Sequence, residues 1–303
     1  MQDIALLAID WGTTSCRAYA LDRHGAIATE RCAPLGVQRV IDGEFGQALK
    51  TLCAGVVDER VPMIACGMIG SRQGWVEAPY CDCPADFGAI AAGLTTVPGT
   101  ALAIVPGLIW RDDDGIADVM RGEETQILGA LAEGAAARRA VLLPGTHSKW
   151  AVVGRDGIEA FSTFMTGELY ALLVEHGILG RLLAPGEDDA ALEQGVCHSL
   201  RGDAAITHDL FAARTLALTD ELAPSAVGDY LSGLLIGAEI AAGQRWLHRL
   251  HRAVLPLTLI GAPALVRRYR RALAIAGIDA DIGAEDAAAR GLWRIARHAG
   301  LLR

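Results

Sequence analysis

An acidic residue followed by a cluster of small hydroxyl residues stands near the N-terminus. The apolar run that starts at Ile4 ends in Asp10, and the small residues that follow are Gly12, Thr13, Thr14 and Ser15. A glycine lets a phosphate group approach the backbone, successive N–H groups bind anions, and hydroxyls add donors. A carboxylate at a strand end, such as Asp10, is a typical Mg²⁺ ligand, often through water. The segment predicts a phosphate-binding turn with a metal ligand, and a solvated hairpin turn is the alternative.

The same pattern returns in the second half of the chain. Its turn consists of Gly145, Thr146, His147 and Ser148, again between two apolar segments. A repeat at a domain-sized interval predicts two related halves rather than a solenoid, and it favours phosphate binding by both turns. The adjacent pair His147 and Ser148 does not favour a hydrolase, because neighbouring strand residues point to opposite faces. The chain also lacks the G-x-x-x-x-G-K-[ST] motif of P-loop enzymes.

Strand and helix patterns alternate around these two turns. Buried strands are expected within residues 61–71 and 101–110, and a strand, small-residue turn and helix over 255–277. Further helices are expected over 123–135, 167–183 (capped by Thr166), 231–250 and 285–300. Such alternation predicts an α/β protein. A domain junction within 134–140 would divide the chain into domains 1–135 and 136–303.

Composition limits the partners of the chain. Its 303 residues suffice for one large or two medium domains, and the net charge of −9 with no long basic block argues against a nucleic-acid surface. Seven scattered cysteines in a chain of this size predict reduced thiols and a cytoplasmic protein. The N-terminus does not have the pattern of a signal peptide, and no apolar run approaches the ~20 residues of a membrane span, so no membrane partner is expected.

Several strings of the sequence resemble a known family. These are DWGTTSCRAY, CGMIGSRQGWVEAPY, MRGEETQILGAL, PGTHSKW and FMTGELYALL. The two G-T-rich hairpins are similar to those of the actin-like ATPase fold of sugar kinases, and the strings closely resemble 2-dehydro-3-deoxygalactonokinases over nearly the whole chain. The resemblance implies two actin-like (ribonuclease H-like) domains with a nucleotide cleft between them. It also implies an ATP- and Mg²⁺-dependent transferase that phosphorylates 2-dehydro-3-deoxy-D-galactonate at its terminal hydroxyl, in D-galactonate degradation.

The resemblance also implies roles for individual residues. Asp10 would help to hold Mg²⁺, and both G-T-x-S turns would bind the phosphates of ATP. Glu123 would orient or deprotonate the attacking hydroxyl, at a helix start that favours an ionised carboxylate. The sequence departs here from the wider carbohydrate-kinase pattern, which has an Asp after the Gly and a longer spacing. The choice between Glu123 and Glu124 therefore stays open, as does a purely stabilising acidic first turn.

The same resemblance implies residues that contact the sugar acid and the nucleotide. An arginine fork suits the carboxylate of a sugar acid, and Arg72 is the first candidate, with a structural salt bridge as an equal alternative. Weaker candidates for the sugar acid are Gln73, Trp75, Arg17 and Arg121. Small residues would leave room for adenosine at Gly233, Gly237, Gly261 and Ala262, although a glycine at a strand end is often only a turn.

Three other functions compete with this interpretation. A kinase for another sugar or keto-deoxy sugar acid would differ only in its pocket loops. A non-metabolic actin-like ATPase would want a further segment for peptide or polymer contacts, and a sugar-responsive repressor would need a helix-turn-helix domain before the first strand. Neither is expected from this sequence, while a homodimer stays an open alternative.

Overall fold

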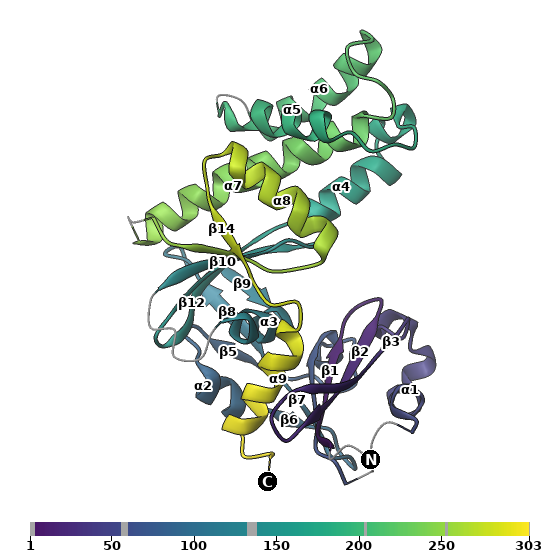
Figure 1. The fold of residues 1–303 in the computed structure, drawn as a ribbon, viewed down its shortest axis with the longest axis vertical. Helices are drawn as coiled ribbons and strands as arrows, with labels where there is room; N and C mark the ends of the chain where they lie inside the picture. The colour runs from purple at the N-terminus through teal and green to yellow at the C-terminus, as the bar shows by residue number, and fades with distance from the viewer. Residues whose placement is uncertain (1–3, 56–59, 132–137, 203–204, 252–253, 303) are drawn as a thin grey trace. The chain divides into compact units, whose positions relative to one another are not determined.

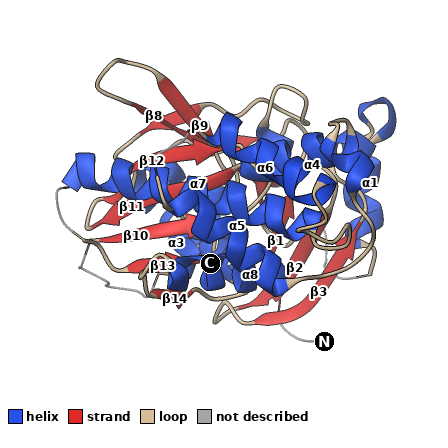
Figure 2. Cartoon of the chain, turned by 90° about the horizontal axis from the view of Figure 1, so that it is seen from above, coloured by secondary structure: helices blue, strands red, loops and turns tan. Residues whose placement is uncertain are grey.

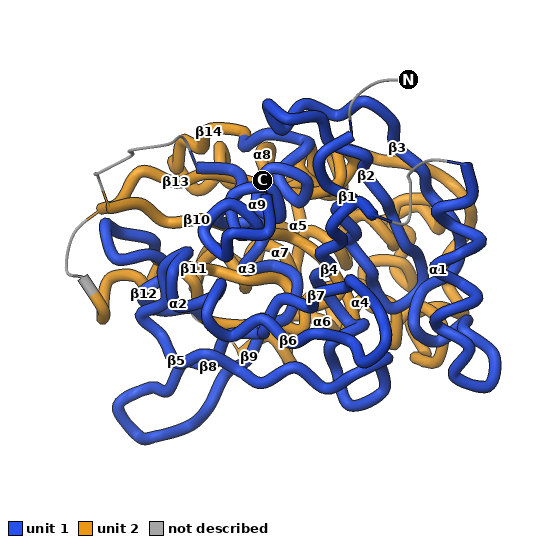
Figure 3. Tube along the Cα trace, turned by 90° about the horizontal axis from the view of Figure 1, so that it is seen from below, with its two compact units in different colours: residues 1–137, 153–161, 283–303 blue, residues 138–152, 162–282 orange. Residues whose placement is uncertain are grey.

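The computed structural model describes residues 4–55, 60–131, 138–202, 205–251 and 254–302. The chain forms two compact units, residues 1–137, 153–161 and 283–303 in the first and 138–152 and 162–282 in the second (Figure 3). The expected junction at 134–140 falls mostly on residues 132–137, outside the described ones. The division into 1–135 and 136–303 stays a prediction, and the structure adds that the C-terminal segment clusters with the first unit.

The first unit is built on a six-stranded sheet of order β3-β2-β1-β4-β7-β6. Its strands are β1 (Ile4–Trp11), β2 (Cys16–Asp22), β3 (Ile27–Ala33), β4 (Met63–Gly67), β6 (Thr95–Thr96) and β7 (Leu102–Ile104). β1 is antiparallel to β2 and parallel to β4, and Asp10 is thereby paired with Arg17 on one side and with Cys66 on the other. The expected hairpin and the buried strand within 61–71 are confirmed.

The segment 101–110 divides between two sheets instead of forming one strand. β7 joins the large sheet, whereas β8 (Gly107–Arg111) lies in a three-stranded sheet with β5 (Tyr80–Asp82) and β9 (Ala117–Met120). Pro106 separates the two strands and has no N–H with which to continue the ladder. The expectation of a single strand was therefore wrong.

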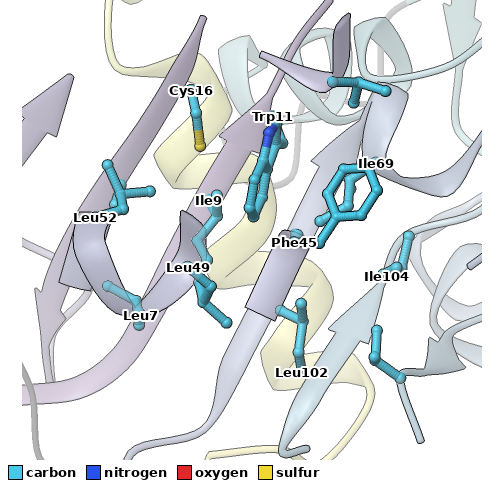
Figure 4. Packing of buried hydrophobic residues seen from close by; sticks show 14 of the residues in the cluster. Leu7, Ile9, Trp11, Cys16, Phe45, Leu49, Leu52, Ile69, Leu102 and Ile104 are labelled. Carbon is cyan, nitrogen blue, oxygen red and sulfur yellow. The ribbon is translucent and has the colours of Figure 1, made fainter. Parts of the chain in front are cut away.

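One face of β1 forms the core of the first unit with helix α1 (Phe45–Cys53). Alternate strand residues point to the same face, so Leu7, Ile9 and Trp11 share the face opposite to Asp10, whereas Leu6 and Ala8 are buried on the same face as Asp10. Figure 4 shows these side chains and their neighbours, among them Leu7, Ile9, Trp11, Phe45, Leu49, Leu52 and Ile69. The core that β1 forms with α1 therefore lies on the face opposite to the Asp10 side chain.

Helices complete the first unit. They are η1 (Val37–Arg39), η2 (Ile41–Gly43), η3 (Met68–Gly70), α2 (Phe87–Ala92), α3 (Glu123–Ala130) and α9 (Ala287–His298). The helix expected over 123–135 is α3, which ends at Ala130 because Leu131 is extended, and the helix expected over 285–300 is α9. Glycines let α3 and α9 pack closely, since a Cβ on Gly129 would lie 1.9 Å from the Ala287 carbonyl oxygen.

The second large sheet has the order β12-β11-β10-β13-β14 (Figure 2). Its strands are β10 (Arg139–Leu143), β11 (Ser148–Gly154), β12 (Gly157–Phe164), β13 (Leu257–Leu259) and β14 (Ala280–Ile282). β10, β13 and β14 are parallel. The G-T-x-S turn joins β10 to β11, as the repeat predicted, and β13 leads through Gly261 and Ala262 into a helix.

The helices of the second unit are α4 (Thr166–Glu175), η4 (Leu179–Leu182), α5 (Asp189–Leu200), α6 (Ile206–Leu218), α7 (Val227–His251) and α8 (Pro263–Ile275). α7 and α8 confirm the helices expected there, and α7 lies alongside α5 (Figure 1). The helix expected over 167–183 ends at Glu175, and Thr166 is its first residue rather than its cap. In the described part of the chain, no helix is long and apolar enough to cross a membrane.

Candidate active site

The turn after β1 presents its hydroxyl side chains to solvent. The N–H of Gly12 donates to the carbonyl of Ser15 (2.9 Å), while Thr13, Thr14 and Ser15 are exposed. From behind, the N–H of Val37 donates to the Gly12 carbonyl (3.0 Å). The turn is therefore held through its backbone carbonyls, which leaves its side chains available to a ligand. Its phosphate-binding role stays a prediction.

Two carboxylates interact beside this turn. Burial raises the pKa of Asp10 to about 6, with the Arg17 guanidinium opposing the shift and the Glu123 carboxylate adding to it. The Cys66 thiol donates to Asp10, with 3.8 Å between Sγ and Oδ1, and favours the ionised form. Asp10 ends β1 and Glu123 begins α3, so strand and helix bring two acids from distant parts of the sequence together. Repulsion between these two carboxylates favours a cation or a proton beside them.

Glycines make this approach of the elements feasible. Gly67, at the end of β4, has φ 91°, and a Cβ there would lie 2.7 Å from the Trp11 carbonyl oxygen. Gly122, before α3, has φ 104°, and its Cβ would lie 3.1 Å from the Cα of Gly67. Such left-handed backbone favours glycine. The sequence analysis missed both positions: Gly122 directly precedes a predicted helix, whereas Gly67 lies inside the strand expected within 61–71.

The two glutamates that start α3 have different surroundings. Glu124 is fully buried, and its two oxygens accept from the Gly122 N–H (2.6 Å) and the Thr125 hydroxyl (2.9 Å). Burial raises the pKa of Glu124 to about 8, and the Glu123 carboxylate adds to the shift. Glu123 is only partly buried and accepts from the Arg121 N–H (3.0 Å). Of the two carboxylates, Glu123 is the one with a solvent-accessible surface.

The predicted sugar-acid residues lie in the loop after η3. The side chain of Arg72 is 88% exposed and forms an ion pair with Glu77 (3.0 Å between Nε and Oε1). Gln73 is exposed, whereas Trp75 stacks on Phe45 with ring centroids 6.1 Å apart. Trp75 thus has a packing role. An exposed ion pair is worth roughly 0–1 kcal/mol, so Glu77 does not bar Arg72 from binding a carboxylate.

Arg17 and Arg121 are placed differently. Arg17 is exposed and lies across from Asp10 on β2. The Arg121 guanidinium donates from Nη2 to the Ala78 carbonyl (2.8 Å) and lies 4.5 Å over the Tyr80 ring. Its Nε and Nη1 are buried with no hydrogen-bond partner within the described ranges. Arg121 therefore holds the loop that carries Arg72, and only Arg17 has an exposed side chain of these two.

The turn of the second unit orients its hydroxyls in opposite directions. Thr146 and His147 are exposed, and His147 Nε2 contacts the Glu168 carboxylate. Ser148 is fully buried, with its hydroxyl 3.1 Å from the Tyr269 hydroxyl. The Ser148 hydroxyl therefore faces inward from the start of β11, and the phosphate contact predicted for Ser148 stays a prediction. The Glu168 N–H donates to Thr146 (3.0 Å), and α4 thereby starts against the turn.

A cavity of about 270 Å³ opens beside Gly145 in the second unit. Most of its lining comes from α4, α7 and α8: Thr166, Gly167, Tyr170, Ser232, Leu235, Ile236, Leu265, Arg268 and Tyr269. Arg268 is held by Asp229 through an ion pair of 2.6 Å. Both Arg268 and Tyr269 lie in the helix expected within 255–277, and no pattern of the sequence indicated a cavity there.

The expected adenosine residues divide into two groups. A Cβ on Gly233 would lie 2.2 Å from the Leu192 carbonyl oxygen, and one on Gly237 would lie 3.0 Å from Val196. Both glycines therefore pack α7 against α5, whereas Ser232 and Ile236 line the cavity from another face of the helix. Gly261 and Ala262 are exposed after β13, and the Cβ position of Gly261 lies 3.5 Å from the Pro144 carbonyl oxygen, beside the turn.

A G-T-x-S hairpin turn in each unit, with paired carboxylates beside one turn and a cavity beside the other, defines an actin-like α/β phosphotransferase. The fold also occurs in the activator of the 2-hydroxyisocaproyl-CoA dehydratase from Clostridium difficile, solved with bound ADPNP. That structure gives a TM-score of 0.53 at 11% identity, covering 98% of this chain and 96% of that one. The likeness concerns the fold alone, and it confirms the expected fold class.

Sequence relatives define the family. The 2-keto-3-deoxy-galactonokinase model matches residues 10–295, and the chain belongs to this family. It is 36% identical over 294 residues to the 2-dehydro-3-deoxygalactonokinase of Escherichia coli, covering 97% of each chain. It is 38% identical over 301 residues to a protein of Rhizobium meliloti named probable 2-dehydro-3-deoxygalactonokinase DgoK1, covering 94% of this chain and 97% of that one.

A solved relative has the same architecture. The crystal structure of a Sinorhizobium meliloti protein assigned as a 2-dehydro-3-deoxygalactonokinase gives a TM-score of 0.88 at 36% identity. It covers 96% of this chain and 98% of that one. The expectation of a phosphotransferase of this family is confirmed, and membership of a kinase family implies ATP as a substrate.

Proposed function

We propose that this chain transfers the γ-phosphoryl group of ATP to the terminal hydroxyl of 2-dehydro-3-deoxy-D-galactonate, giving the 6-phosphate, in galactonate catabolism. The proposal is carried by the interacting carboxylates of Asp10 and Glu123 beside an exposed turn of hydroxyl residues. Phosphoryl transfer needs positioned groups and neutralised charge rather than a covalent intermediate. The family name supplies the sugar acid, and the geometry supports the chemistry.

Glu123 is the general base of the proposed reaction. Its carboxylate takes the proton of the terminal hydroxyl, whose oxygen forms a bond to the γ-phosphorus. The bond from that phosphorus to the β,γ-bridging oxygen breaks, and ADP leaves. The partial exposure of Glu123 and its place at a helix N-terminus suit this role. Glu124 is engaged by Gly122 and Thr125 and holds the helix start.

Asp10 is the residue we assign to Mg²⁺. Mg²⁺ in phosphotransferases is bound by one or two carboxylates together with phosphates and water. The Asp10 carboxylate fits such an ion, because a cation offsets the repulsion from Glu123. When bound, the ion would neutralise charge on the phosphates.

The nucleotide is proposed to contact both turns. Backbone N–H groups and hydroxyls of residues 12–15 and 145–147 would bind the phosphates. The base would enter the cavity next to Gly145, where Leu235, Ile236 and Leu265 offer apolar surface and Ser232 a hydroxyl. Gly261 and Ala262 would leave room beside the turn.

Arg72 is proposed to bind the carboxylate of the sugar acid. The loop of Arg72 follows β4, whose last residue Gly67 lies beside Asp10. Its ion-pair partner Glu77 is exposed, so a substrate carboxylate could take the place of Glu77. Arg17, opposite Asp10, is the second candidate.

Initial rates of ADP formation test the function. The purified chain would be given ATP and Mg²⁺ with no acid, with the galactonate-derived keto-deoxy acid, or with its gluconate-derived epimer. We expect turnover to require an acid and to be fastest with the galactonate-derived one. Equal turnover without any acid would identify an actin-like ATPase, and a preference for the epimer or for a neutral sugar would identify a different kinase.

A further inference from the structure

A cluster of buried polar side chains lies beneath the cavity of the second unit. It joins β11, α4, α7 and α8 through Ser148, Trp150, Thr166, Glu239 and Tyr269. Glu239 is only 3% exposed and Tyr269 only 2%. Buried carboxylates are rare in protein interiors, so Glu239 requires an explanation.

Glu239 accepts hydrogen bonds from several elements at once. The Trp150 indole N–H donates to Oε1 (2.9 Å) and the Tyr269 hydroxyl donates to Oε2 (2.6 Å). Thr166 and Ser148 also hydrogen-bond to this carboxyl group, and Ser148 lies 3.1 Å from the Tyr269 hydroxyl. Burial raises the pKa of Glu239, while these hydrogen bonds act in the opposite direction. Stability alone does not account for the group, because apolar residues of similar volume are often equally good or better.

The partners of Glu239 are also parts of the proposed nucleotide site. Thr166 and Tyr269 line the cavity together with Gly145. Ser148 is the last residue of the G-T-x-S turn. On α7, Glu239 follows the cavity residues Leu235 and Ile236 by four and three positions, and so lies near their face of the helix. One carboxylate thus connects three walls of the cavity and the end of the turn.

We propose that Glu239 is a positioning residue for ATP, which fixes the turn 145–148 and the cavity walls at Thr166 and Tyr269 in their binding geometry. The proposal rests on the proposed function, because it assumes that ATP occupies this cavity. A carboxylate accepts at both oxygens, whereas an amide offers one acceptor and one donor. Glu239→Gln would therefore either set an N–H against the Trp150 N–H or make the Tyr269 hydroxyl accept instead of donate, with little change in volume.

Calorimetric binding of a non-hydrolysable ATP analogue tests this role. We expect Glu239→Gln to weaken analogue binding about tenfold, the size of one lost hydrogen bond to a charged group. The KM for ATP should rise by a similar factor, while the KM for the sugar acid stays within about twofold of the parent value. Tyr269→Phe, which removes one donor to Glu239, should act in the same direction and serves if Glu239→Gln does not fold.

Ser199→Ala is the matched control. The Ser199 hydroxyl donates to the Leu234 carbonyl (2.7 Å) and is buried where α5 meets α7, away from the cavity lining. It should lower the melting temperature without changing analogue binding. If folded Glu239→Gln and Tyr269→Phe bind the analogue as the parent does, Glu239 is merely structural and the proposal is overturned. If the parent protein itself binds no analogue, the proposed function fails instead.

Discussion

At the scale of single residues, two carboxyl groups differ in what their surroundings do to them. Burial and the Glu123 carboxylate raise the pKa of Asp10 to about 6, so the folded chain disfavours the ionised form relative to the unfolded chain. A bound cation would lower the pKa of Asp10 again and favour the carboxylate. Glu124, in contrast, is fully buried and accepts two hydrogen bonds, so a substrate cannot reach its carboxyl group.

Glu123→Gln tests the assignment of the base. We expect kcat to fall by about 10²–10⁴, the range of general-base catalysis, while ATP affinity stays nearly unchanged. Steady-state kinetics and nucleotide binding measure the two quantities. Glu124→Gln is the matched control and should keep most of the activity. If Glu123→Gln keeps its activity and Glu124→Gln loses it, the general base is Glu124 rather than Glu123.

Asp10→Asn should abolish turnover and yet stabilise the ligand-free protein. The pKa of Asp10 is raised from 3.8 to about 6, so the folded state binds this proton more tightly than the unfolded state and loses stability as pH rises through that interval. At pH 8 the substitution should add on the order of 2–3 kcal/mol to the free energy of unfolding, and almost nothing near pH 4. Urea unfolding at both pH values measures this difference.

Asp22→Asn provides a control of opposite sign. Hydrogen bonds from the backbone N–H groups of His24 and Ala26 lower the pKa of Asp22, so its contribution to stability is present at neutral pH and is lost on acidification. The control should destabilise at pH 8. If Asp10→Asn behaves like it, the Asp10 carboxylate is not in the enclosed environment described.

Arg72→Ala tests the sugar-acid contact. We expect the KM for the acid to rise about tenfold or more, as for a lost charged hydrogen bond, and the KM for ATP to change little. Glu77→Gln, which removes only the partner of the ion pair, should leave both values close to those of the parent. Equal increases of both KM values in Arg72→Ala would indicate a structural salt bridge.

At the scale of elements, close backbone contacts set the position of Glu123. α3 is fixed at its start by Gly122 against Gly67, and along its length by Gly129 against α9. The residues 287–298 of α9 are therefore part of what positions the proposed base, although they lie far from it in sequence.

Gly129→Ala should disturb both stability and catalysis. The added Cβ would lie 1.9 Å from the Ala287 carbonyl oxygen, so α3 must shift, and overpacking costs about 1–3 kcal/mol. We expect a lower melting temperature together with a reduced kcat. Gly46→Ala in α1 is the control, because its nearest neighbour is Trp75 at 3.7 Å and alanine favours a helix. If Gly129→Ala lowers the melting temperature but leaves kcat unchanged, the packing of α3 against α9 does not position Glu123.

The elements also show what the sequence could predict. Both hairpins, Asp10 at its strand end and Glu123 at its helix start follow from local patterns, and all are found. The sequence did not predict the direction of side chains. Ser148 shares the motif of Ser15 but points inward, and Gly233 faces α5 instead of the cavity. These orientations depend on which helix packs against which face, and residues four apart on α7 share a face whether it contacts a ligand or another helix.

At the scale of the whole molecule, each unit contains part of the chemistry. The first holds the paired carboxylates and the loop of Arg72, and the second holds the cavity and the buried cluster around Glu239. Both begin their sheets with the same hairpin and turn.

Ligand-induced stabilisation should reflect this division of the site. A ligand that binds only the folded state at 100 times its Kd adds about 2.7 kcal/mol to the free energy of unfolding. We expect the non-hydrolysable ATP analogue with Mg²⁺ to raise the melting temperature, and Glu239→Gln to reduce that rise. Asp10→Asn should remove the part that depends on Mg²⁺. An equal rise with and without Mg²⁺ in the parent protein would contradict the assignment of Asp10.

The most direct test of phosphoryl transfer is the identity of the product. The chain would be incubated with ATP, Mg²⁺ and 2-dehydro-3-deoxy-D-galactonate, and phosphorus NMR with mass spectrometry would follow the γ-phosphoryl group. We predict a new phosphate monoester on the terminal carbon of the sugar acid, in equal amount to ADP, and its absence with Glu123→Gln. Release of inorganic phosphate alone, or an unmodified sugar acid after ATP has been consumed, would contradict the proposed function.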